Sequence, residues 1–519
     1  MKELQAENSL PPPATLGLWL GYGALCVGMF MAILDIQVVV TSLAVIEDAL
    51  SIGADRMSWV QTTYLIAEII SIPLTGLLIR IFTIRWLFIG AILTFTVASV
   101  GCALSFDFAS LIICRVLQGF AGGVLIPLVF SAIFLLFGKG FKQTVATTIG
   151  GLLAVLAPTF GPLVGGWITE NYTWHWLFLI NVGPGVVTLI VGFFGLPRGL
   201  TKLQLFKTLD WISLIFVAAG LAALLIALKQ APQDGWWTPK VMGLFASVAV
   251  CAGLAIRRPT SAISFSLLRD RNLAFGCILS FILGAGLFGS VYLMPLFLAF
   301  VDGMKPFSIG LVILVTGIAQ LLTAPLVVQI DRFMDARFLS AVGFLAFAAG
   351  LFMSGFQTIN TGYNEMFWPQ VVRGSFVALC ILPPIRFALG FIPRENVADA
   401  SGLFNLSRNL GGAIGIALID TIVFSRSPEF ADRIMDMLKS DPSKAAGLLG
   451  LQTADLPDAQ DPSGLMGIMD IIQQASLTLA INEAWLMLSG ITALALLVLA
   501  VMGPIRVPAL ALSPPRNAV

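Results

Sequence analysis

The sequence predicts an all-α polytopic membrane protein that crosses the bilayer about fourteen times. Its 519 residues are 58% hydrophobic and only 11% charged, whereas soluble domains carry about 45–50% apolar and about 25% charged residues. The mean hydropathy is +0.95. Apolar runs of about twenty residues, the length that crosses the hydrocarbon layer, recur along the whole chain. These observations exclude a soluble globular protein.

The expected transmembrane spans follow one another at short intervals. In order, they are 17–46, 57–79, 86–104, 108–137, 144–169, 176–196, 210–229, 240–258, 273–300, 307–330, 338–357, 367–392, 397–424 and 480–506.

Lysine and arginine set the expected orientation. If the N-terminus is cytoplasmic, that side carries roughly twice as many Lys and Arg residues as the opposite side, so the positive-inside rule places both termini in the cytoplasm. Weak similarity between spans 1–6 and 9–14 suggests two halves with two inserted helices. The expected parts are a cytoplasmic segment 1–16, a six-helix half 17–196, inserted helices and linkers 197–272, a second half 273–506 with an extracytoplasmic loop 425–478, and a cytoplasmic tail 507–519.

Composition also limits the chemistry. The formal net charge of +1 gives no reason to expect a nucleic-acid partner,. The six cysteines lie in apolar spans without Cys-x-x-Cys spacing, and His175 is the only histidine, so we expect no metal site. No nucleophile–base arrangement or phosphate-binding loop is present, which argues against an enzyme and against ATP-driven transport. We expect no cofactor.

Four ionisable residues lie deep inside the apolar spans: Asp35, Glu68, Arg115 and Arg408. Each costs about 2.5–3.5 kcal/mol at a bilayer centre by translocon scales, and such charges usually mark ion paths, proton relays or substrate sites. We therefore take them as the candidate site.

Asp35 and Glu68 are the two carboxylates of this set. An unpaired carboxylate that binds a proton when occluded and releases it when wetted can carry protons, and Asp35 is either such a carrier or a structural hydrogen-bond acceptor. Glu68 shares a helix face with Gln61, Tyr64, Ser71 and Thr75, a polar stripe that we expect to line a cavity. The residues that we expect to contact substrate are Glu68, Tyr64, Gln61, Arg408 and Asn405. Glu68 is a second proton site, a selector of cationic substrates, or a partner of Arg115.

Arg115 stays charged at any accessible pH, so it can stabilise a nearby carboxylate or be released when that carboxylate binds a proton. Arg408 shares a face with Asn405 and can hold an anion, pair across the halves or seal the packing. Arg373, Arg386 and Asp399 lie nearer the ends of the expected spans, where we expect their side chains to snorkel toward the membrane surface.

Two further segments carry candidate roles. Pro158, Gly161, Pro162, Gly165 and Gly166 lie in one span, where proline can kink the helix and glycine allows close packing; the segment is a gate or a static packing face. In the loop 425–478, apolar residues recur at helical spacing, so it either folds against the protein's own outer surface or docks a periplasmic partner.

At these residues the chain resembles the fourteen-helix drug:proton antiporters of the EmrB/QacA type, in the major facilitator superfamily. The resemblance covers nearly the whole chain and is closer to the EmrB side, because of the long loop before the last helix. Its markers are Leu34-Asp35, Ser71 to Gly76, Arg115 to Gly119, Gly161 to Gly166, Trp176 to Asn181, Ser401 to Gly412 and Ala480 to Glu483.

The resemblance implies a major facilitator fold and export of lipophilic compounds in exchange for protons. It assigns Asp35 and Arg115 to coupling and the Gly-Pro segment to the antiporter motif. It also implies a bacterial inner membrane location, a membrane-fusion adaptor and an outer-membrane channel. The family has acidic and glycine elements after the second helix, which Arg80–Arg85 lacks, so the resemblance carries no conformational latch over to this loop. Glu68 is not typical of the family and is a candidate selector.

Three functions remain open from the sequence. The first is a proton-coupled multidrug exporter. The second is a dedicated transporter of one charged metabolite, with Glu68 and Arg408 contacting the substrate. The third is a non-transporting scaffold, which would explain the long loop but not the buried charges.

Overall fold

The computed structural model describes residues 15–40, 46, 50, 59–138, 140–257, 265–331, 333–457 and 462–502. Most of the expected segment 1–16, residues 41–45 of the first span, residues 258–264 of the expected part 197–272 and the tail 507–519 lie outside this set. Every element in the described part is a helix. Thirteen of the described helices are long and apolar enough to cross a membrane.

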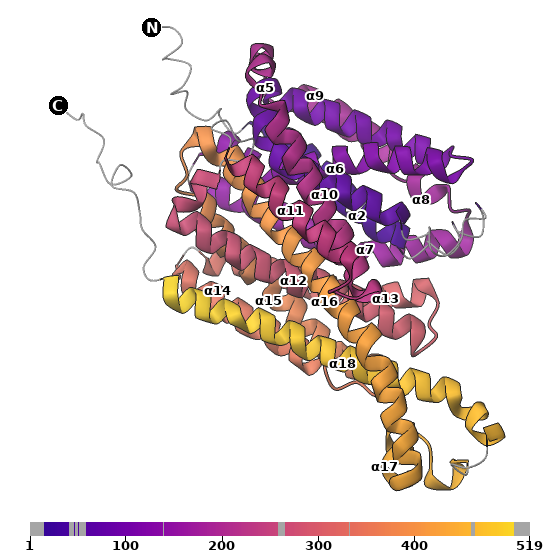
Figure 1. Ribbon diagram of the computed structural model, residues 1–519. Coiled ribbons are helices and arrows are strands. Elements are labelled where there is room, and N and C mark those ends of the chain that lie inside the picture. The colour runs from indigo at the N-terminus through magenta and orange to yellow at the C-terminus, as the bar shows by residue number, and fades with distance from the viewer. Residues whose placement is uncertain are drawn as a thin grey trace.

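The helices follow the expected order along the chain (Figure 1). The longer ones are α2 (Leu16–Val40), α5 (Trp59–Ala103), α6 (Phe108–Leu136), α7 (Phe141–Asn171), α9 (Val182–Gly195), α10 (Trp211–Asp234), α11 (Pro239–Ile256), α12 (Arg271–Phe300), α13 (Pro306–Ile330), α14 (Ala336–Met353), α15 (Tyr363–Leu389), α16 (Val397–Ser440) and α18 (Pro462–Met502). The short ones are α8 (Trp176–Leu179), α17 (Pro442–Leu448), η1 (Leu203–Thr208), η2 (Phe265–Arg269), η3 (Arg394–Asn396) and η4 (Thr453–Asp455).

Helix α5 contains two of the expected spans, which accounts for the count of thirteen. The two arms meet at Thr83, whose backbone is not helical (φ 69°, ψ 163°). Val60 in the first arm and Ser99 in the second both contact the same turn of α6, around Arg115 and Gln118. The chain therefore reverses direction at Thr83 and crosses the bundle twice.

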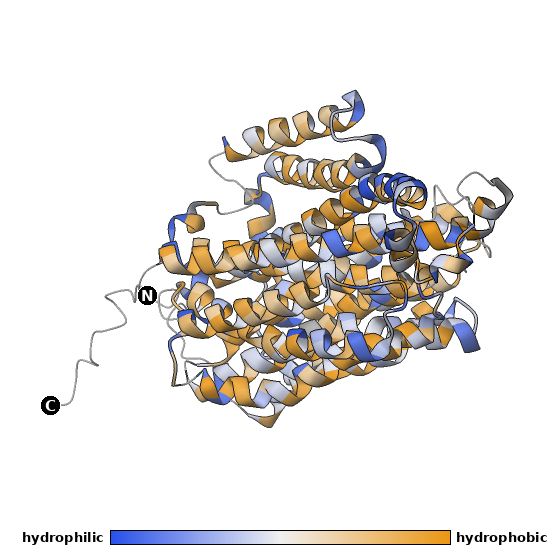
Figure 2. Ribbon diagram, turned by 90° about the horizontal axis from the view of Figure 1, so that it is seen from below, coloured by the Kyte–Doolittle hydropathy of each residue, from blue (hydrophilic) through white to orange (hydrophobic). Residues whose placement is uncertain are grey.

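The bundle is apolar inside and outside. Figure 2 shows hydrophobic colour along most helices and hydrophilic colour mainly at helix ends and connections. Large apolar side chains such as Phe194, Leu322 and Leu497 are exposed on its surface, as expected for residues that face lipid. Between the early and late helices, α7 packs on α13 and α16 packs on α5 and α6. The inserted helix α10 contacts α11, α5 and α16.

The segment expected to be a loop, 425–478, is mostly helical instead. Helix α16 runs on to Ser440, α17 and η4 follow, and α18 already begins at Pro462. We call this part the helical extension; it projects from the bundle (Figure 1). Its helices share a small core of their own, made of Ile434, Leu438, Ala445, Leu449, Ile468, Ile472 and Ala475. The extension therefore packs chiefly on itself rather than folding back over the outer surface.

Candidate functional site

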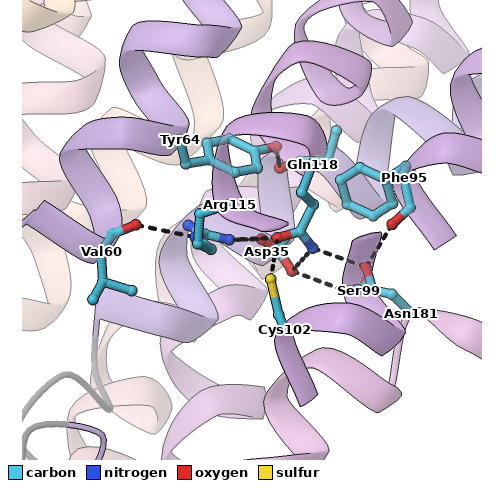
Figure 3. Close-up of polar contacts among 10 residues, drawn as sticks. Asp35, Val60, Tyr64, Phe95, Ser99, Cys102, Arg115, Gln118 and Asn181 are labelled. Atoms are coloured by element: carbon cyan, nitrogen blue, oxygen red, sulfur yellow. Dashed lines mark hydrogen bonds and ion pairs between the residues drawn. The ribbon is translucent and has the colours of Figure 1, made fainter. Parts of the chain in front are cut away.

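A fully buried ion pair occupies the interior of the early helices. Arg115 of α6 donates a hydrogen bond from Nη1 to Oδ2 of Asp35 in α2 over 2.6 Å, and neither side chain is exposed. Figure 3 shows the two side chains pointing toward one another, with Gln118 beside them. Removing both charges from water costs several kcal/mol per ion, and the pair is favourable only with further hydrogen bonds.

Two amides supply those further bonds. Gln118 Nε2 and Asn181 Nδ2 both donate to Oδ1 of Asp35, over 2.9 Å and 2.7 Å. Gln118 also accepts from Arg115 Nη1 over 2.7 Å and donates to Ser99 Oγ over 2.8 Å. The carboxylate is thus held by α6 and by the turn between α8 and α9, and the amide of Gln118 is anchored on α5.

The guanidinium of Arg115 has its own support. Its Nε donates to the carbonyl of Val60 over 3.1 Å, and its Cζ lies 4.3 Å from the centre of the Tyr64 ring. Tyr64 in turn donates its hydroxyl to the carbonyl of Ala32 over 3.0 Å. Among the described residues, Arg115 Nη2 has no hydrogen-bond partner. Tyr64, expected to contact substrate, is fully buried in this conformation and forms a wall of the Arg115 site.

Close approach of α5 and α6 creates this geometry. A Cβ atom at Gly119 would collide with the backbone of Tyr64, and one at Gly123 would collide with the backbone of Glu68. The polar stripe of α5 is therefore packed against α6 at these points, and the hydroxyls of Ser71 and Thr75 bond to backbone carbonyls of their own helix. We expected the stripe to line a cavity, but it does not do so along its whole length. Gln61, at one end of the stripe, is only half-buried.

Glu68 lies where the early helices meet α16. It is buried, and its carboxylate lies within the electrostatic influence of both Arg408 and Arg115. Arg408 Nη2 donates to Asn405 Oδ1 over 2.7 Å, and the Cζ of Arg408 lies 5.5 Å from the centre of the Phe130 ring of α6. The ion pair that Arg115 forms is with Asp35. Glu68, Arg408 and Asn405 thus form a second polar group between the two halves.

The Gly-Pro segment of α7 lies against two other helices. Pro158, Gly161, Pro162, Gly165 and Gly166 are all buried. A Cβ atom at Gly161 would collide with Gln37 of α2, and one at Gly166 would collide with the backbone of Pro306 and Phe307 at the start of α13. Farther along α7, Glu170 accepts a bond from the backbone N–H of Phe307 over 3.2 Å. The segment therefore connects the early helices to the late ones.

Two of the residues expected to snorkel form ion pairs instead. Asp399 of α16 accepts from Arg80 over 2.6 Å, and Arg386 of α15 donates to Asp331 over 2.9 Å. Each acidic partner is almost fully buried. The pair of Arg80 and Asp399 joins α5 to α16 and is therefore a charged contact between the halves. It is present although the segment Arg80–Arg85 lacks the acidic residue and the glycine of the family pattern.

Arg373 is the third residue expected to snorkel, and that expectation is wrong. It lies near the middle of α15 and is only 3% exposed. The sequence missed it because the expected span, 367–392, placed Arg373 near a helix end, whereas α15 begins at Tyr363. Gln118 and Asn181 were likewise absent from the expected site. A polar amide one turn from Arg115 was the signal that could have identified Gln118.

The comparisons with known proteins decide the family. The profile described as Major Facilitator Superfamily matches residues 25–416. The chain is 35% identical to the colistin resistance protein EmrB of Acinetobacter baumannii over 81% of its own length and 82% of that protein. This chain belongs to the major facilitator superfamily, as an EmrB-type transporter.

Other comparisons agree with this assignment. The EmrB-type chain is 28% identical to the multidrug export protein EmrB of Escherichia coli, over 90% of its length and 92% of that protein. The crystal structure of the human organic anion transporter MFSD10 superposes with a TM-score of 0.59 and 12% identity, covering 94% of this chain and 100% of that one; at this identity it shows the fold alone. The EmrB-type chain is therefore a multi-pass membrane efflux transporter for small molecules.

Proposed function

We propose that this transporter exports lipophilic small molecules from the cytoplasm in exchange for protons, by alternating access in a bacterial inner membrane. The observation that carries the proposal is the sealed pair of Asp35 and Arg115, because a fully buried carboxylate that depends on one arginine responds strongly to a proton,. The printed names of the relatives, multidrug export and colistin resistance, support the substrate class.

The coupling step follows from charge. A proton on Asp35 removes the negative charge that balances Arg115, so the guanidinium becomes an unpaired cation inside the protein. Moving Arg115 away from Tyr64 and Val60, or opening the helices around it, relieves that cost. Release of the proton to the cytoplasm restores the pair. One proton then moves inward for each cycle of this carboxylate, while the substrate moves outward.

The test is flux in proteoliposomes driven by a pH gradient, measured with a chemically diverse panel of lipophilic cations and neutral compounds. We expect wild type to transport several of them and Asp35→Asn to lose gradient-driven transport while remaining folded. Exchange of unlabelled for labelled substrate without a gradient should persist in that variant. Normal gradient-driven transport by Asp35→Asn would remove Asp35 from the mechanism. If wild type dissipates no gradient with any compound, the scaffold hypothesis is favoured.

Substrate selection is the role we propose for Glu68, with Arg408 and Asn405 beside it. Glu68 is a buried carboxylate on which the charges of Arg408 and Arg115 act without a recognised ion pair among the described contacts, so it is available to attract a cationic substrate,. Glu68→Gln should therefore lower transport of cations relative to neutral compounds, while Glu395→Gln, an exposed acid in η3, should leave the ratio unchanged. An unchanged cation preference in Glu68→Gln would exclude this role.

The polar group around Glu68 also favours a second candidate, a dedicated transporter of one charged metabolite. Glu68 and Arg408 carry opposite charges at the same boundary, and such a pair suits a single zwitterionic or charged compound,. Transport of one compound only, unaffected by competing lipophilic cations, would favour this candidate over the multidrug exporter.

We also propose that the helical extension docks a periplasmic adaptor, which would connect the transporter to an outer-membrane channel. The extension has its own apolar core and leaves Met466 and Met469 exposed. Bidentate bonds from Arg426 to Glu483, over 2.8 Å and 2.9 Å, fix its base. Cross-linking from a photoreactive residue at position 466 should capture the adaptor, and capture at position 194, on the bundle surface, should not exceed background. Equal capture at both positions would contradict the proposal.

A further inference from the structure

Arg85 is a buried arginine without a counter-charge at one end of the bundle. It lies in the second arm of α5, just after the reversal at Thr83, and is 5% exposed. Among the described residues, its Nε has no hydrogen-bond partner and its guanidinium forms no ion pair. Its Nη1 and Nη2 are not enclosed and donate to no described residue either. A buried charge left without a partner is costly, so the free edge of this guanidinium calls for an anion.

Two aromatic rings hold the guanidinium in place. Its Cζ lies 4.5 Å from the centre of the Phe193 ring of α9 and 5.8 Å from the centre of the Trp86 ring. Both rings, and Phe194 beside them, are exposed on the outside of the bundle. A cation–π contact stabilises the charge but supplies no hydrogen-bond acceptor, so the N–H donors of Arg85 remain available where the protein meets lipid.

The segment after α9 adds two cations beside this position. Arg198 and Lys202 are both exposed. The backbone N–H of Lys202 donates to the carbonyl of Ile81 over 2.8 Å, so the segment packs on α5 directly before Arg85. Between the two cations, Leu200 is 91% exposed, as suits an apolar side chain that enters the lipid. The segment therefore presents basic and apolar side chains at the same membrane edge.

No acidic residue of the neighbouring sequence balances these charges. Residues 71–106 and 171–209 contain neither Asp nor Glu. Asp399, which reaches α5 from α16, is paired with Arg80. Asp210 accepts from the backbone N–H at the start of α10 as its N-cap. The cluster is therefore positive, and the anion that it suits has to come from outside the chain.

The location of the cluster indicates the source of that anion. The reversal at Thr83 and the segment 197–209 each connect two transmembrane helices at the same side of the membrane, the side that we expect to face the cytoplasm. Phospholipid phosphates lie at this depth, and basic residues there attract anionic lipids. A guanidinium also matches two phosphate oxygens at once.

We propose that Arg85, Arg198 and Lys202 bind the phosphate of an anionic phospholipid, with its acyl chains against Trp86 and Phe193. The bound lipid would join α5 to the segment after α9 through one headgroup. The inference does not rest on the proposed function, because a lipid can occupy this site whether or not the chain exports drugs in exchange for protons.

The test counts retained lipids by native mass spectrometry. The purified full chain, stripped of lipid in detergent, is titrated with phosphatidylglycerol or phosphatidylcholine of identical acyl chains. We expect wild type to prefer phosphatidylglycerol, and Arg85→Gln to bind it about tenfold or more weakly, because a charge-assisted contact is lost. Arg257→Gln removes an exposed arginine at the end of α11, on the same expected side of the membrane. This matched control should bind as wild type.

Three results would overturn the site: equal retention of the two lipids by wild type, unchanged binding by folded Arg85→Gln, or an equal loss in Arg257→Gln. An excess of inorganic phosphate should displace little lipid; full displacement would show that the site takes free phosphate and would reject the lipid. If Arg85→Gln cannot be purified as folded protein, the double variant Arg198→Gln and Lys202→Gln replaces it, since both side chains are exposed. Unchanged preference in that variant would reject the site, and a loss that Arg257→Gln does not show would support it.

Discussion

Arg80 and Asp399 lie 319 positions apart in sequence and form an ion pair of 2.6 Å between α5 and α16. The arginine is 40% exposed and the aspartate is 7% exposed. This ion pair lies where a helix of the first half meets a helix of the second. It is formed in this conformation, and it must be strained or broken when the two halves separate there.

A double-mutant cycle measures this pair. We expect Arg80→Gln and Asp399→Asn each to lower the free energy of unfolding, with a coupling of about 1 kcal/mol because Arg80 is partly solvated. Thermal unfolding of the four proteins in one detergent gives the coupling. Arg337→Gln, which removes an exposed pair within one half, serves as the comparison. Strict additivity at Arg80 and Asp399 would show that the contact stabilises nothing.

Variants of Asp35 and Arg115 should affect the free energy of unfolding and the gradient-driven flux differently. Asp35→Asn leaves Arg115 buried without its counter-charge, so we expect a loss of about 3–5 kcal/mol in the free energy of unfolding. Adding Arg115→Gln should recover part of that loss but none of the gradient-driven flux. Thermal unfolding and flux on the same preparations test this, with Asp432→Asn, at an exposed position of the extension, as control. A double variant no more stable than Asp35→Asn would contradict the argument.

Gly166 should tolerate no added methyl group. A Cβ at this position would collide with the backbone of Pro306 and Phe307, so Gly166→Ala should push α7 away from α13 and reduce flux several-fold. Gly490→Ala is the matched control, because nothing lies within 4 Å of the Cβ there. Alanine raises helix propensity by about 1 kcal/mol, so the control should be slightly stabilised. Wild-type flux in Gly166→Ala would show that the helices adjust freely.

Among the residues that the structure describes, Thr83 is the one non-glycine residue with a positive φ. Its angles, φ 69° and ψ 163°, lie in a region used almost only by glycine, at a cost of about 1–3 kcal/mol. Thr83→Gly should therefore raise the thermal unfolding midpoint. Thr83→Ala removes the hydroxyl, which has no partner among the described residues, but retains the Cβ. Equal effects of the two changes would assign the gain to the hydroxyl and not to the backbone.

Much of this arrangement could be predicted from sequence, because lipid permits few alternatives. Apolar runs near twenty residues must be helices, and α10, α12 and α13 lie close to their expected ranges. Asp35 and Arg115 were conspicuous as charges in such runs. What could not be predicted was the pairing. Nothing in the sequence says that Arg115 turns to Asp35 instead of Glu68, since α2, α5 and α6 are all near neighbours.

The other differences share a cause. The helical extension was taken for a loop because its polar residues break the apolar pattern, although the spacing of Ile434 and Leu438 was helical. Arg373 was misassigned because a shift of a few residues in a helix boundary moves a side chain from the membrane surface to the interior,. Contacts between distant helices, such as that of Arg80 with Asp399, have no local signal at all.

The inserted helix α10 limits the routes by which a compound dissolved in the bilayer can reach the interior. Lys229 of α10 donates to Thr62 of α5 over 2.7 Å, and Trp236, just after α10, donates to Thr421 of α16 over 3.0 Å. Helix α10 also packs on both α5 and α16, and most of it is not buried inside the bundle, so α10 and the residues after it cover the contact between α5 and α16 from the outside. In this conformation that seam is closed to lateral diffusion, and a lipophilic compound must reach the interior from elsewhere on the perimeter or from the aqueous side.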